Sequence, residues 1–402
     1  MNADLKAELR LAERGRQLRA FALVAPLLTF LVVIFVLPIG FTMFFAVASP
    51  EVRNVLPRTA GAIADWDGSD LPDEATFEAL VQDLQNGAAA KTVAGLGTRL
   101  NYEISGYRSL IMRSSRRAKN MDAPYKDALI ERDPRWGELE YWRAMKTAIG
   151  PLTPRYLLQV LDLERSWDGS ITRVSAERAV YVNYLVRTFW ISVSVTVLCI
   201  FIGYPIAVVA AHSSQAIGRL VLAAVLLPFW ISVLVRTAAW VVVLQKEGVI
   251  NSAMIHLGII DEPVQLIFNR LGVYVAMVHV LLPFLVLPLY SVMKNIPMLH
   301  MRAAESLGAK PISAFLTVYL PQSLPGLSAG TLLVFILSLG YYITPALVGG
   351  PGDQMLSYLV TEFALEIGNW GMAGAAAFLL LVSTLVAYAV FRKLLGARGF
   401  MA

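Results

Sequence analysis

The chain has 402 residues, of which 57% are hydrophobic and only 16% are charged, and its formal net charge at pH 7 is +5. This composition is too apolar for an ordinary soluble domain and is typical of a protein that crosses a membrane several times. The small net charge gives no reason to expect a nucleic-acid partner, and the single cysteine, Cys199, excludes a disulfide within the chain.

Six windows with almost no charge predict six membrane-spanning helices, because each holds the roughly 20 residues that a helix needs to cross about 30 Å of hydrocarbon. The fifth window is too long for one crossing, so we place its span near Leu324–Thr344. The first window could be a cleaved signal sequence, but its apolar run is about twice the usual length, which favours a permanent anchor. The windows are Ala20–Pro50, Thr188–Gly218, Leu220–Gln245, Leu271–Met293, Pro311–Gly352 and Ile367–Phe391.

The distribution of basic residues predicts that both ends of the chain lie in the cytoplasm, the side on which short loops are enriched in Lys and Arg. The short loops on the opposite side offer only Lys246 and Arg270. An even number of spans agrees with this orientation. The basic residues before the first span, after the last and between the fourth and fifth are Lys6, Arg10, Arg14, Arg16, Arg19, Lys294, Arg302, Lys310, Arg392, Lys393 and Arg398.

This topology predicts an all-α, polytopic membrane protein with a large extracytoplasmic insertion between its first two spans. The expected parts are a cytoplasmic segment (1–20), a first span (21–49), a periplasmic insertion (50–181), a core with the other five spans (182–395) and a cytoplasmic tail (396–402).

The insertion has the charge content of a soluble domain, with 18 Lys and Arg and 19 Asp and Glu from Glu51 to Val180. Long loops cross the membrane largely regardless of such charges. A helix is predicted from Leu71-Pro-Asp-Glu74 to Asn86-Gly87, because apolar residues recur at helical spacing between them: Phe77, Leu80, Val81 and Leu84. Trp136–Ile149 and Tyr156–Leu163 show similar patterns. Two roles stay open, a lid or scaffold on the outer face and a dock for an external solute-binding protein.

The sequence carries no sign of an enzyme. It has no phosphate-binding loop, since Gly-Lys never occurs, and its four histidines lie in different segments, so neither a catalytic nor a metal site is predicted: His212, His256, His279 and His300. The spans hold no carboxylate, whereas proton- and sodium-coupled carriers commonly keep ionisable groups within the membrane. We therefore expect the energy for any uphill transport to come from another subunit.

The cytoplasmic loop at 294–322 predicts two short helices set at an angle. The first covers about 297–307 and contains Ala303 and Ala304, whose small side chains allow a partner to approach closely. Gly308 is suited to the left-handed residue that often ends a helix.

The second helix of this loop is predicted over about 311–320, because Pro311 fits the first turn of a helix. Pro321 and Pro325 are then expected to break or bend the chain as it enters the fifth span. Such a loop could be an ordinary amphipathic connector on the membrane surface or a docking element for another protein.

The loop resembles the "EAA" loop of type I ABC-importer permeases, whose pattern is Glu-Ala-Ala, three residues, Gly, nine residues and Ile-x-Leu-Pro. Val318 lies at the isoleucine position, and Arg302 replaces the leading glutamate. In that family the loop inserts into a cleft of the ATPase subunit and transmits its closure to the membrane helices. The resemblance assigns the coupling role to Arg302, Ala303, Ala304, Glu305, Gly308, Val318, Leu320 and Pro321.

The resemblance extends over about Val182–Arg392 and is strongest for the spermidine/putrescine branch of the family. Leu227–Trp240 is similar to the third-span signature of that branch, and Thr344–Gly350 and Asn369-Trp-Gly371 are similar to its outer loop. The branch also contains permeases for opines, phosphonates and ferric ion. The resemblance implies a bacterial inner-membrane permease that works with an ABC ATPase dimer, a second permease subunit and a periplasmic solute-binding protein. It also implies that ATP and Mg are bound by the ATPase subunits and that this chain holds no cofactor.

A pathway for the solute is predicted around Arg236, the only charge within a span. This arginine could extend to the membrane interface or form hydrogen bonds between subunits, or it could be a gate. Aromatic rings near it could bind an ammonium group transiently, although aromatic residues are equally common at membrane interfaces. A polyamine would be repelled by Arg236, so that substrate rests on the resemblance. The candidate pathway residues are Phe229, Trp230, Arg236, Trp240, Tyr341, Tyr342, Thr344 and Pro345.

We therefore expect the membrane-spanning subunit of an ATP-driven importer for polyamines or a related small polar solute. An importer of another solute of the same branch is the main alternative. An ion-coupled secondary carrier and a receptor-like protein that uses its spans only as an anchor are the others.

Overall fold

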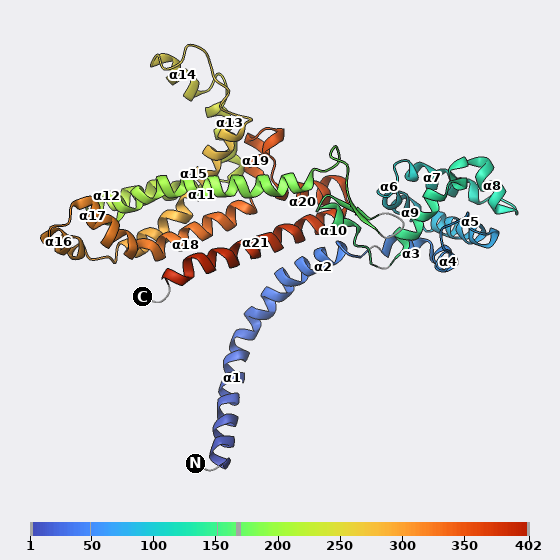
Figure 1. Ribbon diagram of the computed structural model, residues 1–402, viewed down its shortest axis with the longest axis horizontal. Helices are drawn as coiled ribbons and strands as arrows, with labels where there is room; N and C mark the ends of the chain where they lie inside the picture. Colours follow the sequence, from blue (N-terminus) through green and yellow to red (C-terminus); the bar gives the residue numbers. More distant parts are fainter. Residues whose placement is uncertain (1–2, 49, 151, 166–169, 400–402) are drawn as a thin grey trace. The chain divides into compact units, whose positions relative to one another are not determined.

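The computed structural model describes residues 3–48, 50–150, 152–165 and 170–399, and the chain divides into two compact units. The insertion unit comprises Met1–Leu157, Arg165–Ile171 and Asn369–Ala375. The core unit comprises Leu158–Glu164, Thr172–Gly368 and Ala376–Ala402. Both are mainly helical (Figure 1), which confirms the predicted fold class. The last three residues of the predicted tail, 400–402, lie outside the described residues.

The first span belongs to a long helical segment that begins well before the membrane. It consists of α1 (Ala3–Leu31), a π-helical turn η1 (Val32–Val36) and α2 (Leu37–Phe45). The apolar part, Ala20–Phe45, is long enough to cross a membrane, and none of its most apolar window is buried. The helix ends at Phe45, four residues before the predicted end at residue 49, which is not among the described residues.

The insertion is built from short helices that surround an aromatic core. Phe77, Trp136 and Trp142 are fully buried, and the Trp142 ring lies 4.7 Å from Phe77 and 5.4 Å from Trp136, measured between ring centroids. The helices are α3 (Pro50–Val55), α4 (Pro57–Ala62), α5 (Glu74–Ala89), α6 (Val93–Asn101), α7 (Tyr107–Ala118), α8 (Tyr125–Arg132), the 3-10 helix η2 (Pro134–Gly137), α9 (Leu139–Ile149) and α10 (Arg155–Gln159).

The predicted helix after Leu71 is confirmed as α5. It begins where the Asp73 carboxylate accepts the backbone N–H of Thr76, and its predicted apolar stripe is buried. It ends at Ala89 rather than at Gly87, because the missing side chain of Gly87 lets Val55 and Val93 pack against the helix.

The prediction of a helix over Tyr156–Leu163 is wrong in its second half. α10 ends at Gln159, and Leu163 begins a short strand, β1 (Leu163–Arg165), which pairs with β2 (Ile171–Arg173). Asp162 lies between α10 and β1 with φ of +57°, and its carboxylate accepts the backbone N–H groups of Val180, Tyr181 and Val182. The first N–H groups of a helix have no acceptor within the helix itself. Asp162 supplies that acceptor and so caps the helix that follows, instead of extending α10.

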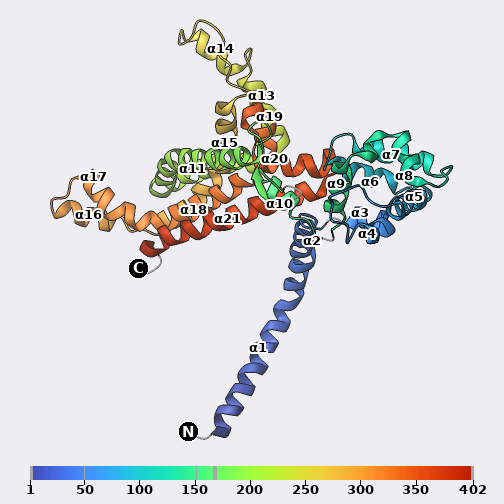
Figure 2. The ribbon, with the colours of Figure 1, turned by 45° about the vertical axis from the view of Figure 1, so that its right-hand side comes forward.

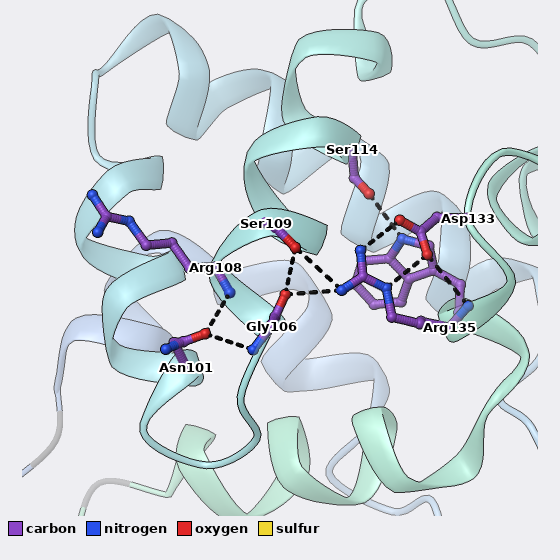
Figure 3. A network of polar contacts seen from close by, with 8 residues as sticks. Asn101, Gly106, Arg108, Ser109, Ser114, Asp133 and Arg135 are labelled. Atoms are coloured by element: carbon purple, nitrogen blue, oxygen red, sulfur yellow. Dashed lines mark hydrogen bonds and ion pairs between the residues drawn. The ribbon is translucent and has the colours of Figure 1, made fainter.

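An arginine fixes the start of α7 in the insertion (Figure 3). Arg135 binds both carboxylate oxygens of Asp133, at 2.8 and 2.7 Å, and also donates to the carbonyl of Gly106 at 2.9 Å. The side chain of Asn101 accepts the backbone N–H groups of Gly106 and Arg108. Gly106 has φ of +91°, a left-handed conformation that glycine adopts without strain. The network therefore holds an otherwise flexible turn in one conformation.

The core unit is organised around three long helices, α11 (Tyr181–His212), α15 (Arg270–Met293) and α18 (Leu320–Leu339), which lie side by side (Figures 1 and 2). Glycines allow the close approach: a Cβ added at Gly203 on α11 would lie 2.6 Å from Leu285, and one at Gly330 on α18 would lie 2.8 Å from the Leu285 carbonyl. Small residues at helix contacts are typical of membrane proteins.

The remaining helices of the core unit are shorter, except for the last. They are α12 (Gln215–Leu226), η3 (Leu227–Trp230), α13 (Val233–Leu244), α14 (Val249–His256), α16 (Leu299–Ser306), α17 (Pro311–Ala314), the π-helical turn η4 (Phe315–Tyr319), α19 (Ile343–Val348), η5 (Pro351–Asp353), α20 (Leu356–Thr361), the π-helical segment η6 (Glu362–Ile367) and α21 (Trp370–Gly399), whose first residues belong to the insertion unit.

The prediction of one continuous third span over Leu220–Gln245 is wrong. Within the described residues five helices are long and apolar enough to span a membrane, and a sixth candidate is a pair, Gln215–Trp230 and Val233–His256, that bends by 103°. Pro228 lies at the start of the 3-10 turn, and Ile231 after it is extended. Because proline cannot donate to a helical hydrogen bond, the chain breaks there and a new helix starts after Ser232.

Of the break or bend expected before the fifth span, the break does not occur, because Pro311–Leu339 forms one continuous helical segment of 29 residues. Pro321 and Pro325 both lie within its helical part α18. The π-helical turn η4 directly precedes Pro321, and its wider hydrogen-bonded ring changes the register where a proline would otherwise clash with the preceding turn. The helix ends at Leu339, five residues before the predicted end at Thr344.

Candidate functional site

The predicted cytoplasmic loop consists of α16, a tight turn and the start of the helix that continues into α18. Gly308 has φ of +94°, its N–H donates to the Glu305 carbonyl at 2.9 Å, and the Ala309 N–H donates to the Ala304 carbonyl at 3.1 Å. These two bonds and the left-handed glycine define a Schellman turn. The predicted role of Gly308 as the C-terminal cap of the first helix is confirmed.

The turn presents both polar and large apolar side chains to its surroundings. Arg302, Ala303 and Glu305 are exposed, and Ala304 is half-buried. Among the described residues neither Arg302 nor Glu305 forms an ion pair. The apolar side chains around them are exposed by 70%, 90%, 76% and 52%, in the order Leu299, Leu307, Ile312 and Leu316. So much exposed apolar surface around a small turn is typical of a contact for another protein.

The other predicted loop residues lie further along, where the helix enters α18. Val318 is half-buried in η4, and Pro321 lies in the first turn of α18. The Val318 carbonyl accepts a hydrogen bond from Gln322, whose side-chain oxygen lies 2.9 Å from Nδ1 of His300 on α16. Leu320, half-buried, opens α18 beside them. The two ends of the loop are thus joined by side chains as well as by the chain.

Arg236 lies on α13, just after the break in the third span, and only 8% of its surface is exposed. Its Nη2 donates to the carbonyl of Ile231 at 2.7 Å. That carbonyl belongs to the extended residue at the break and has lost its helical partner. The Nε atom is buried and has no hydrogen-bond partner among the described residues. Arg236 therefore stabilises the bend and keeps one donor free.

Two neighbours of Arg236 join α13 to α15 and α19. Trp240 donates from Nε1 to Nδ1 of His279 on α15 at 3.1 Å, with the rings perpendicular. Thr237 and the predicted residue Thr344 are buried, and their hydroxyl oxygens lie 3.2 Å apart. Both His279 and Tyr341 are within electrostatic range of Arg236.

The structure brings some of the predicted pathway residues together and separates others. Arg236 and Trp240 both lie on α13, after the break. Tyr341 lies between α18 and α19, and α19 supplies Thr344 and Pro345, both buried.

Phe229 and Trp230 precede the break, and Trp230 is 90% exposed. The Phe229 ring contacts Phe284 of α15 at 5.0 Å instead. Tyr342 is half-buried at the start of α19. A straight third span would have aligned Phe229 and Trp230 with Arg236 and Trp240 along one helix.

Sequence reasoning missed His279 and Thr237 as members of this site. His279 is a polar residue in the middle of the apolar helix α15, and Thr237 directly follows the only charge of the predicted spans. Both signals are visible in the sequence, but a lone polar residue in a span does not by itself show which helix it faces.

The second half of the chain is similar in sequence to known proteins. Residues 203–396 match the family described as "Binding-protein-dependent transport system inner membrane component". The spermidine/putrescine transport system permease protein PotB of Salmonella typhimurium is 30% identical over 202 residues, which are 50% of this chain and 70% of that protein. The inner membrane ABC transporter permease protein YdcU of Escherichia coli is 34% identical over 232 residues, 54% of this chain and 72% of that protein. A putative 2-aminoethylphosphonate transport system permease protein, PhnU, of Salmonella paratyphi A is 25% identical over 217 residues, 53% and 74% of the two chains.

The chain belongs to this family. It is a type I ABC-importer permease, a multi-pass protein of the inner membrane, as its loop motif predicted. The match to the family begins at residue 203, so the first span and the insertion of this permease lie outside the matched region.

Proposed function

We propose that this permease imports polyamines or a closely related small polar solute and that it takes energy from ATPase subunits through the loop from Met301 to Pro321. The observation that carries the coupling role is the capped turn at Gly308, which holds a short helix and its exposed apolar side chains in one conformation. A loop that transmits force must be stiff, and a Schellman turn without flexible residues on either side meets that requirement.

The exposed apolar side chains support a cytoplasmic protein partner for the loop. Burying a leucine or isoleucine side chain contributes about 1.5–3 kcal/mol, so Leu307 and Ile312 could anchor α16 in a cleft of an ATPase subunit. The expected partners are an ABC ATPase dimer, which binds ATP and Mg, and a second permease subunit. In this proposal both chain termini are cytoplasmic, and this chain binds no cofactor of its own.

The substrate proposal rests on the relatives that are named for spermidine and putrescine. The Arg236 charge repels an amine, so binding during passage would be weak and would come from aromatic side chains such as Trp240 on the same helix. An ammonium group gains roughly 0.5–2 kcal/mol from each aromatic face. Weak contacts suit a pathway that must release its solute.

A second candidate, an aminophosphonate, is favoured by the free donor of Arg236. Its buried Nε has no acceptor among the described residues, and a phosphonate oxygen would supply one. One relative is named for 2-aminoethylphosphonate transport. A solute with both an amine and a phosphonate would satisfy the arginine and the rings together.

We assign the insertion to contact with the periplasmic solute-binding protein, which favours the docking role over a lid. α7 carries four exposed positive charges and no carboxylate, and its C-terminal cap adds a fifth: Arg108, Arg113, Arg116, Arg117 and Lys119. The insertion as a whole is close to neutral, so these charges are segregated onto one surface. A segregated positive surface suits an acidic surface on a soluble partner.

The decisive experiment reconstitutes the permease with its ATPases, second permease and solute-binding protein and measures ATP-dependent uptake of labelled putrescine, spermidine, an opine and 2-aminoethylphosphonate. Uptake of the first two is expected. Gly308→Pro should stop uptake while ATP hydrolysis continues and the protein still inserts, because the turn loses its left-handed residue. Wild-type uptake by this variant would contradict the coupling role, and uptake by the permease alone under an ion gradient would contradict the ATP-driven mechanism.

A further inference from the structure

A polar and aromatic contact joins the C-terminal end of α11 to the helix that follows the coupling loop. Nε2 of His212, the last residue of α11, lies 2.5 Å from the hydroxyl of Tyr319 in η4, and their rings are 5.3 Å apart at 66°. Tyr319 is 98% buried, since only 2% of its surface is exposed. Its hydroxyl therefore has little access to water, and the bond to His212 satisfies it.

Several further contacts hold this pair in place. The ring of Phe315 stacks on Tyr319 at 5.5 Å, and Tyr204 of α11 packs edge-on against Phe315 at 6.0 Å. Tyr204 also forms a hydrogen bond of 2.8 Å with Ser323 of α18. The Lys294 ammonium group, at the end of α15, donates to the Ala211 carbonyl beside His212 at 3.3 Å. The end of α11 is thus attached to both flanks of the coupling loop.

The local backbone of this contact is unusual. Phe315–Tyr319 is a π-helical turn, a rare conformation that is frequent at functional sites, and its last two residues begin the Val318–Pro321 part of the loop motif. One extra residue per turn changes which side chains share a face. The stacked pair Phe315 and Tyr319 is thereby presented to α11 at the point where the loop helix enters the membrane core.

The order of the helices along the chain explains why this contact matters for the movement of α11. α15 leads directly into the coupling loop and α18 leaves it, so both helices move with the loop through covalent bonds. α11 is separated from the loop by α12 to α15 and can receive its motion only through side-chain contacts. The bond joins the exposed His212 ring to the buried Tyr319 hydroxyl. A short hydrogen bond to a buried group transmits displacement better than an apolar surface along which helices can slide.

We infer that His212 and Tyr319 form a joint that carries the movement of the coupling loop into the second span, α11. They are positioning residues, since they contact neither the solute nor the reacting nucleotide. The inference rests on the proposed coupling role of the loop. It adds α11 to the helices that move with the loop, and it names one pair that joins α11 to the loop helix itself.

The test uses Tyr319→Phe in the full reconstituted importer, because this change removes one oxygen and keeps the ring. Tyr204→Phe is the matched control: it makes the same change in the same cluster but breaks the bond to Ser323 instead. The measurement is the number of solute molecules imported per ATP hydrolysed. We expect this ratio to fall about fivefold in Tyr319→Phe, the effect of one buried hydrogen bond on a conformational equilibrium, and to change little in Tyr204→Phe.

His212 provides the second arm of the test. His212→Ala should lower the ratio as Tyr319→Phe does, His212→Gln should restore part of it because an amide can still bond the hydroxyl, and the double variant His212→Ala with Tyr319→Phe should be no worse than either single change. A wild-type ratio in Tyr319→Phe, or equal losses in Tyr319→Phe and Tyr204→Phe, would overturn the joint.

Failure of the joint is distinguishable from failure of the proposed function. The coupling role of the loop is tested separately, in chains that keep His212 and Tyr319. The tests are co-purification of the ATPases with the wild-type chain and the effect of Gly308→Pro. If those two results hold while the Tyr319→Phe ratio stays normal, the loop couples transport without passing its movement through His212.

Discussion

The insertion and the three-helix core show two ways of holding helices together within one chain. The insertion packs large aromatic residues such as Trp136 and Trp142 and fixes its turns with charged side chains such as Arg135. The helices α11, α15 and α18 pack instead through glycines that admit a neighbouring side chain, at Gly203, or a neighbouring backbone, at Gly326 and Gly330. The difference follows from the surroundings. In water the burial of apolar surface drives packing, whereas in lipid it gives no advantage and close van der Waals contact must replace it.

The largest loss of stability is expected when an aromatic residue is removed from the core of the insertion. Trp142→Ala should destabilise the insertion by about 3–5 kcal/mol, because it leaves a cavity between Phe77 and Trp136. Hydrogen exchange, followed separately in peptides of α5 and α15, would measure the loss of protection. Trp66→Ala, at a half-buried position, should cost less. If Trp142→Ala lowered the protection of α15 as much as that of α5, the insertion and the three-helix core would not have separate hydrophobic cores.

A smaller effect is expected from filling a close contact of the three-helix core. Gly330→Leu should cost about 1–3 kcal/mol, because its Cβ would lie 2.8 Å from the Leu285 carbonyl and a backbone atom cannot turn aside as a side chain can. Thermal unfolding in lipid nanodiscs would show it. Gly340→Leu is the matched control, since its Cβ would meet only the Leu337 carbonyl, at 3.9 Å. Similar melting temperatures for the two variants would show that the glycine contacts do not limit packing.

The smallest effect concerns the charges of the insertion and depends on pH. Hydrogen bonds from Arg135 lower the pKa of Asp133 below its usual value of 3.8. Because the pKa is lower in the folded chain, the pair stabilises the insertion above the unfolded pKa, and this contribution is lost as the pH falls through the folded pKa. We expect less than about 1 kcal/mol, since the pair is partly solvated.

Protection of the α7 peptide, measured between pH 6 and pH 3, would test the charge prediction. Asp133→Asn should be less protected at pH 6 and should change less as the pH falls. A wild-type chain and an Asp133→Asn variant with the same pH dependence would contradict it.

Local features of the sequence predicted local structure well. The Asp73 cap and apolar spacing identified α5, and Gly308 was recognised as a helix end, because each depends on residues only a few positions apart. The membership of the ABC-importer permeases also followed from a short motif. Each of these signals is recognised from a short stretch of sequence and does not depend on how distant segments pack.

Features that depend on tertiary contacts were missed. Pro228 broke the third span although its composition was that of a straight helix, whereas Pro321 and Pro325 did not break the fifth, because a π-helical turn accommodated them. Nothing in the spacing of these prolines separates the two outcomes. The pairing of Trp240 with His279 likewise requires knowing that α13 and α15 face each other.

The bend in the third span constrains how the core unit can sit in a bilayer. Ile231 and Ser232 are exposed, non-helical residues between two apolar helices. The Ile231 N–H donates to the Pro228 carbonyl, and the Ile231 and Ser232 carbonyls accept from the side chain and the backbone N–H of Arg236. The Ser232 N–H is left without a partner among the described residues. Acyl chains offer no hydrogen bonds, so such backbone is stable at membrane depth only beside water or protein. The surface around Ile231 is therefore turned away from the lipid, toward an aqueous passage or a neighbouring subunit.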